Sequence, residues 1–78
     1  MNNKDVLKKV IALFSTMSET EDITKESELI DDLGISSMDI LFLVSRLEAE
    51  FKVSVPEKEV RKLVTVGDVA DMVIRLTK

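Results

Sequence analysis

Apolar side chains return every three or four positions in the first part of the chain. The stripe runs over residues 4–17, and lysines occupy the opposite side. This spacing is the period of an amphipathic α-helix with one face against a core. The stripe consists of Val6, Val10, Leu13, Phe14 and Met17, with Leu7 and Ile11 beside it. The pattern therefore predicts a first helix from about Lys4 to Met17.

Residues 18–35 show no sustained period and predict a long polar loop. We expect Leu29, Ile30 and Leu33 to anchor this loop to the core, with a single helical turn near Leu29. A loop of this length in so small a protein indicates a functional segment.

A second helix is predicted from Ser37 to about Phe51. Its inward positions are Ile40, Leu43, Val44, Leu47 and Phe51, at offsets of three and four. Ser36 stands three residues before Asp39, which resembles a capping box with Ser36 as the N-cap. This arrangement uses Ser36 structurally and leaves Ser37, at the first helical position, free and exposed.

Two further helices complete the pattern. Pro56 suits a helix start, so residues 56–63 predict a short third helix that contributes Val60 and Leu63 to the core. Thr65 and Asp68 form a second capping-box pair, and a last helix follows. Its inward positions are Val66, Val69, Ala70, Val73, Ile74 and Leu76. Residues 53–55 alternate but are too few for a strand. We expect an all-α four-helix bundle of three longer helices and one short helix, forming a single domain over residues 1–78.

The composition narrows the possible functions. The chain has 78 residues, of which 45% are apolar, and contains neither cysteine nor histidine. It therefore lacks disulfides, thiolate ligands, a cysteine nucleophile and the commonest general base, so we do not expect an enzyme. The start of the chain shows neither a signal peptide nor a membrane span, and we expect a cytoplasmic monomer.

Negative charge is concentrated in the middle of the chain. Residues 18–51 carry ten acids against two bases and a net charge of −8, whereas the whole chain carries −4. Such a field repels nucleic acid, which we exclude as a partner, and attracts basic protein surfaces. A merely solvated acidic surface would give the same composition.

Several short motifs are spread over nearly the whole chain: Asp31–Gly34, Ser36–Asp39, Leu43–Val44, Leu47–Glu48, Phe51, Val55–Pro56 and Thr65–Asp68. Together they resemble a known family, the free-standing acyl carrier proteins of dissociated fatty acid or polyketide synthesis. It implies that Ser37 carries 4′-phosphopantetheine, which a magnesium-dependent phosphopantetheinyl transferase takes from coenzyme A. The acyl cargo would then be a thioester on the arm, presented to acyl-transferring and chain-elongating or ligase enzymes. A chain without cysteine requires such an imported thiol.

The chain also departs from the family pattern. Ser36 replaces the aspartate that usually precedes the attachment serine, and Phe42 and Ala49 stand where glutamate is common. Arg46 adds a positive charge, while Asp39, Glu48 and Glu50 remain.

These changes fall on one side of the second helix. Met38, Phe42, Ser45 and Ala49 form its outer stripe, where partner enzymes of the family dock. Phe42 lies about 200° around the helix from the inward Ile40, so we expect it to be exposed. We therefore expect this stripe, with the remaining acids Asp39 and Glu48, to contact partner enzymes.

Alternatives remain open at this stage. The carrier could serve general fatty acid synthesis or a dedicated lipid or polyketide pathway. An aminoacyl or peptidyl carrier would more often show a Gly-Gly pair before the serine, whereas this chain has the single Gly34. An unmodified helical interaction module is the third hypothesis. If the chain is a carrier, we expect its cargo to insert among Leu43, Val44, Leu47, Val60, Leu63, Val69 and Val73.

Overall fold

The computed structural model describes residues 3–17 and 22–77, and four helices form there. They are α1 (Asn3–Met17), α2 (Ser37–Phe51), α3 (Glu57–Val60) and α4 (Val66–Leu76). Within these residues no strand forms, and the one bridge joins Glu28 to Thr65. None of the described helices is both long and apolar enough to cross a membrane. The predicted all-α fold of three longer helices and one short helix is confirmed.

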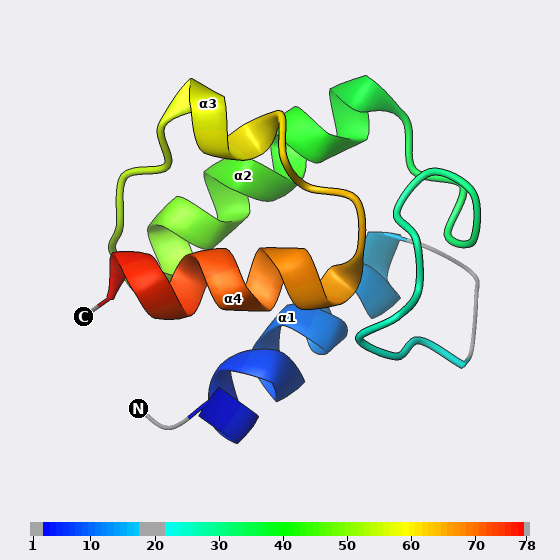
Figure 1. Ribbon diagram of the computed structural model, residues 1–78, viewed down its shortest axis with the longest axis horizontal. Coiled ribbons are helices and arrows are strands. Elements are labelled where there is room, and N and C mark those ends of the chain that lie inside the picture. Colours follow the sequence, from blue (N-terminus) through cyan, green and yellow to red (C-terminus); the bar gives the residue numbers. More distant parts are fainter. Residues whose placement is uncertain (1–2, 18–21, 78) are drawn as a thin grey trace.

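The helices enclose one apolar core. Helices α1 and α4 share the most extensive contact between helices. In Figure 1, α1 lies below α4, whereas α2 and α3 lie above it, with α3 beside α2. The core residues on the helices are Val6, Val10, Phe14, Ile40, Leu43, Val44, Leu47, Val66, Val69, Ala70, Met72 and Val73. Most were expected from the helical spacing, and Met72 is a buried residue that the pattern analysis did not include.

The loop before α2 is anchored by a helical turn, as predicted, but not by all three expected residues. Leu29 and Leu33 are buried, whereas Ile30 is 59% exposed, so the prediction for Ile30 was wrong. Residues four apart in a helical turn share a face, while the residue next to Leu29 is rotated by about 100°. Ile35, which was not assigned to the core, is buried instead. Residues 18–21 of the predicted loop lie outside the described residues.

Gly34 ends this turn in a left-handed conformation, with φ of 66°. Its N–H donates to the carbonyl of Ile30, and the N–H of Ile35 donates to the carbonyl of Leu29. Glycine adopts this conformation without the steric cost that a Cβ atom adds. The reversal places Ile35 in the core and leads the chain directly to the start of α2.

The same loop is hydrogen-bonded to the connection between α3 and α4. The Leu29 N–H donates to the Val64 carbonyl over 2.9 Å, and the Gly67 N–H donates to the Lys25 carbonyl over 2.8 Å. A Cβ atom on Gly67 would lie 2.9 Å from that carbonyl oxygen, so the contact requires glycine. The loop is therefore held against the first turn of α4.

Helix α3 is shorter than the sequence predicted. Pro56 is its N-cap in an extended conformation, and the α-helix ends at Val60. Two backbone hydrogen bonds between residues three apart continue the turn to Leu63. The Lys62 N–H donates to the Glu59 carbonyl, and the Leu63 N–H donates to the Val60 carbonyl. Such bonds form a tighter turn than the α-helix. Val60 and Leu63 pack against the core from this segment, as expected, and both stay partly exposed.

Candidate functional site

The start of α2 is fixed by a reciprocal capping box between Ser36 and Asp39. The Asp39 N–H donates to Ser36 Oγ over 3.2 Å, and the Ser36 N–H donates to Asp39 Oδ2 over 3.1 Å. Ser36 has the extended backbone that an N-cap requires. The predicted capping box is confirmed, and it occupies the Ser36 hydroxyl.

Ser37 is the first residue of α2, and its side chain is exposed. Its hydroxyl makes no hydrogen bond to any residue in the described ranges 3–17 and 22–77. The backbone N–H groups of Ser37 and Met38 have no acceptor within the helix, because the first turn lacks a preceding one. The site therefore combines an accessible hydroxyl with the positive end of a helix dipole.

An open groove of about 370 Å³ begins at Ser37. Its walls come from α2, from the loop and from the segment containing α3. The apolar lining residues are Ile30, Ile40, Leu41, Val60 and Leu63, and Glu57 and Arg61 lie at its polar side. A chain attached to Ser37 would have an apolar surface beside it.

The outer stripe predicted on α2 is exposed. Met38 is 76% exposed and Phe42 57%, and Ser45 and Ala49 are also exposed. The expected exposure of Phe42 is confirmed, whereas a contact of this stripe with partner enzymes stays a prediction.

The two acids expected beside the stripe both have roles within the chain. Asp39 is exposed and belongs to the capping box. Glu48 is only partly exposed, and its Oε2 atom accepts a hydrogen bond from the Val55 N–H over 3.0 Å. Glu48 therefore fixes the segment that leads to α3. The position of Glu48 in the sequence did not indicate this role.

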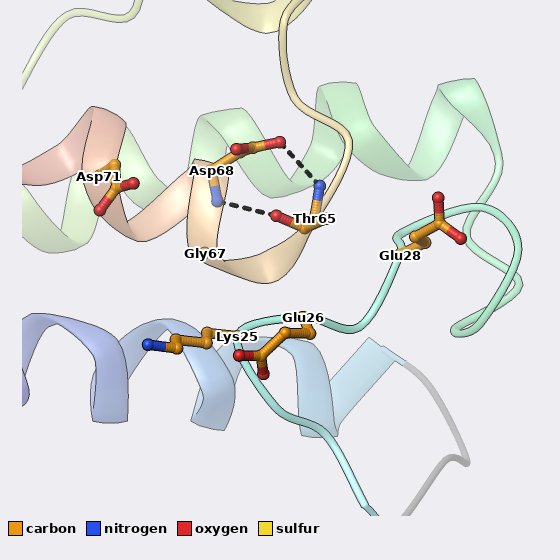
Figure 2. A pocket seen from close by; sticks show the side chains of 7 residues that line it. All are labelled: Lys25, Glu26, Glu28, Thr65, Gly67, Asp68 and Asp71. Carbon is orange, nitrogen blue, oxygen red and sulfur yellow. Dashed lines mark hydrogen bonds between the residues drawn. The ribbon is translucent and has the colours of Figure 1, made fainter.

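A second hollow, of about 450 Å³, lies between the loop and the start of α4. Figure 2 shows Thr65 and Asp68 joined by the second predicted capping box, with Lys25 and Glu26 on the facing loop. Asp68 Oδ2 also accepts from the Val64 N–H. Within the described residues, no group of three or more acids has the geometry of a metal site. Beside this hollow, the hydrogen bond from the Gly67 N–H to the Lys25 carbonyl joins the loop to α4.

Sequence reasoning missed two of the apolar residues that line the Ser37 groove. Leu41 and Ile30 line it and are both 59% exposed. Leu41 lies four positions after Ser37 and therefore one turn away on the same side of α2. That spacing could have indicated Leu41, but nothing local indicated that Ile30 would face the groove.

Comparison with known proteins gives a consistent result. Residues 5–73 match the family described as the phosphopantetheine attachment site. An acyl carrier protein of Clostridium perfringens is 40% identical over 74 residues, covering 95% of this chain and 96% of the relative. An acyl carrier protein of Campylobacter lari is 40% identical over 75 residues, covering 95% of each. The structure of the acyl carrier protein from Enterococcus faecalis superimposes with a TM-score of 0.83 at 28% identity, covering 97% and 99% of the two chains.

Fold and family thus define a small helical carrier domain with a phosphopantetheine attachment site. The chain belongs to the acyl carrier proteins. Acyl carrier proteins are not enzymes; they hold acyl groups for enzymes that act on them. The exposed hydroxyl at the start of α2, beside an apolar groove, fits a covalently attached arm of this kind.

Proposed function

We propose that Ser37 carries 4′-phosphopantetheine and that the chain presents acyl groups on this arm to enzymes of fatty acid or specialised lipid and polyketide synthesis. The observation that carries the proposal is the contrast between two adjacent serines. Ser36 Oγ accepts the Asp39 N–H in the capping box, whereas the Ser37 hydroxyl is exposed and free of hydrogen bonds within residues 3–17 and 22–77. Only Ser37 can react without loss of the cap.

The surroundings of Ser37 favour a phosphodiester. In the attachment step, Ser37 Oγ forms a bond to phosphorus and loses its proton to a base of the transferase. The pyrophosphate P–O bond of coenzyme A breaks, and adenosine 3′,5′-bisphosphate leaves with the electron pair. The negative phosphodiester then lies at the N-terminus of α2, where free N–H groups and the dipole stabilise it by about 0.3–1 kcal/mol. A phosphopantetheinyl transferase is therefore the first partner we propose.

The chain itself supplies position and an apolar surface. It contains no cysteine, so the thiol that bears the acyl group must come from the attached arm. Ile40, Val60 and Leu63 line the groove beside Ser37 and can shield apolar cargo from water. The apolar lining suits an acyl group as the cargo. We also propose that the carrier acts as a monomer.

Intact mass after incubation with coenzyme A and a broad-specificity phosphopantetheinyl transferase tests the proposal. The wild type should gain the mass of one phosphopantetheine, Ser37→Ala should gain none, and Ser36→Ala should still gain it. Circular dichroism should show that Ser37→Ala keeps its helices. Loss of the mass gain in Ser36→Ala but not in Ser37→Ala would show that Ser36 is the attachment residue.

The same measurement separates the alternatives. A wild-type chain that never gains mass would be an unmodified interaction module. If mass is gained, analysis of the protein loaded in its native cells distinguishes an acyl cargo from an aminoacyl or peptidyl cargo. The single Gly34 before the serines and the apolar groove favour the acyl cargo.

A further inference from the structure

The groove beside Ser37 contains one cationic side chain. Among the described residues that line it, Arg61 is the only base and Glu57 the only acid. Both belong to the segment of α3, which lies beside α2 in Figure 1, and Ser37 is the first residue of α2. The neighbouring bases Lys58 and Lys62 are exposed and do not line the groove. An anion attached to Ser37 would therefore share the groove with a single guanidinium.

Arg61 is only weakly engaged within the protein. Its Nη2 atom donates to Glu57 Oε1 over 2.9 Å, the one hydrogen bond or ion pair of this side chain within residues 3–17 and 22–77. The two side chains are 77% and 81% exposed, and exposed pairs four residues apart contribute little to stability. A guanidinium carries five N–H donors, so most donors of Arg61 stay free. Another anion can therefore replace Glu57.

The group proposed on Ser37 is an anion of the right chemistry. A phosphodiester oxygen pair matches the planar fork of a guanidinium, which can donate two parallel hydrogen bonds to it. Because the phosphodiester would be bonded to Ser37 Oγ, it stays close to the groove and meets Arg61 at a high effective concentration. A contact too weak to hold a free ion can thus form with a tethered one. The nearby Asp39 carboxylate is occupied by the Ser36 N–H in the capping box.

We propose that Arg61 binds the phosphodiester of the 4′-phosphopantetheine arm and is a positioning residue of this carrier. The inference rests on the proposed function, because the anion is present only after Ser37 has been modified. On loading, Arg61 leaves Glu57, whose exposed carboxylate is then solvated at little cost. Arg61 directly follows Val60, and both line the groove. The contact therefore directs the first part of the arm along the apolar lining instead of leaving it to move freely in solvent.

A purely structural role for Arg61 makes a different prediction. Glu57 is the first residue of α3 and Arg61 its C-cap, so their ion pair spans this short helix. If support of α3 were its only role, replacing Arg61 would have the same effect on stability before and after loading. Binding of the phosphodiester makes the effect larger in the loaded protein.

The test compares the unmodified and loaded forms of the full chain as wild type, Arg61→Gln, Arg61→Lys and Lys62→Gln. Each protein is loaded with coenzyme A and a phosphopantetheinyl transferase, and intact mass verifies complete loading. The change in Tm on loading should be about 2–4 °C less favourable in Arg61→Gln than in the wild type. Arg61→Lys should keep part of the effect, because an ammonium group supplies charge without the planar fork. Lys62→Gln is the matched control and should follow the wild type within about 1 °C.

Phosphorus NMR of the loaded proteins observes the contact directly. The phosphodiester resonance should move in Arg61→Gln and stay in place in Lys62→Gln. Raising the salt concentration from about 0.1 M to about 1 M should bring the wild-type resonance close to that of Arg61→Gln, because salt screens an exposed ionic contact.

Glu57→Gln supplies the opposite change. It removes the carboxylate that competes for Arg61, so loading should raise Tm more than in the wild type. The same substitution in an Arg61→Gln background should give a smaller increase, because only the repulsion between Glu57 and the phosphodiester is then removed.

The outcomes separate this contact from the attachment itself. A wild type that gains no mass would overturn the proposed function, and the role of Arg61 with it. Complete loading with equal Tm changes and equal phosphorus resonances in wild type and Arg61→Gln would overturn only the role of Arg61. So would an Arg61→Gln protein that loads more slowly but matches the wild type once loaded, because Arg61 would then contact the transferase and not the arm.

Discussion

Arg75 of α4 holds a buried carboxylate of α3, since its Nη2 atom lies 2.9 Å from Glu59 Oε2. Glu59 is only 7% exposed, and its Oε2 atom forms no aligned hydrogen bond within the described residues, so the contact is a charge pair. Val60, the next residue, lines the groove beside Ser37. The pair therefore ties one wall of the proposed cargo groove to the helix that packs on α1.

Removing Arg75 should destabilise the fold. Arg75→Gln leaves the Glu59 carboxylate buried without its cation, and the free energy of unfolding should fall by about 1–2 kcal/mol in urea titrations. The cost stays below the roughly 3–5 kcal/mol of a fully buried pair, because the Arg75 side chain is more than half exposed to solvent. Amide exchange over residues 60–63 should become faster.

Arg61→Gln provides the control for this prediction. It removes the pair between Arg61 and Glu57, whose side chains are both largely exposed, and should cost about 0.5 kcal/mol or less. Equal losses in the two variants would contradict the importance of the buried carboxylate.

The capping box predicts different stabilities for two adjacent serine variants. Ser36→Ala removes the acceptor of the Asp39 N–H and should lower the free energy of unfolding by about 1 kcal/mol. Ser37→Ala removes an unbonded hydroxyl and should leave stability nearly unchanged. Thermal unfolding of the unmodified proteins measures the difference, which should be about 4–8 °C in Tm. Identical melting temperatures would mean that the cap contributes nothing.

Cargo length should affect stability if acyl chains enter the protein. Leu43, Leu47 and Val73 are fully buried, so a chain that starts at Ser37 must first pass between α2 and the partly exposed Val60 and Leu63. Each buried methylene contributes about 0.8 kcal/mol at most, so Tm should rise with chain length until the space is filled. Calorimetry of the holo protein and a series of acylated forms measures the trend. A constant Tm across the series would place the cargo in solvent.

At position 67, replacing glycine by alanine should lower the stability of the protein, which is the opposite of the usual effect of this change in a helix. Alanine normally stabilises a helix by about 1 kcal/mol relative to glycine. In this protein the added Cβ atom would lie 2.9 Å from the Lys25 carbonyl oxygen, so Gly67→Ala must displace the loop. We expect a net loss of about 1–3 kcal/mol in unfolding experiments and faster amide exchange at position 67.

Gly34→Ala is the comparison for Gly67. Nothing lies within 4 Å of a Cβ atom built there, but φ is +66°, so backbone strain alone should cost about 1 kcal/mol. A Gly67→Ala protein that is more stable than the wild type would show that the loop yields without cost.

Local interactions in the sequence were enough to predict the three longer helices and the different roles of the two serines at the start of α2. Helical periodicity and the pairs Ser36 with Asp39 and Thr65 with Asp68 involve residues three or four apart. Such contacts form wherever the segment is helical, whatever surrounds it. The exposure of Phe42 followed from the same spacing, because it lies opposite the inward face of α2.

Tertiary packing decided the features that depend on distant segments. Glu48 bonds to Val55 and Glu59 is buried against Arg75, although both acids occupy unremarkable polar positions in the sequence. Ile30 faces the Ser37 groove because Leu29 and Leu33 occupy the inward side of the same turn. A residue's partner across the core depends on how whole elements pack, and a local pattern of polar and apolar residues does not contain that information.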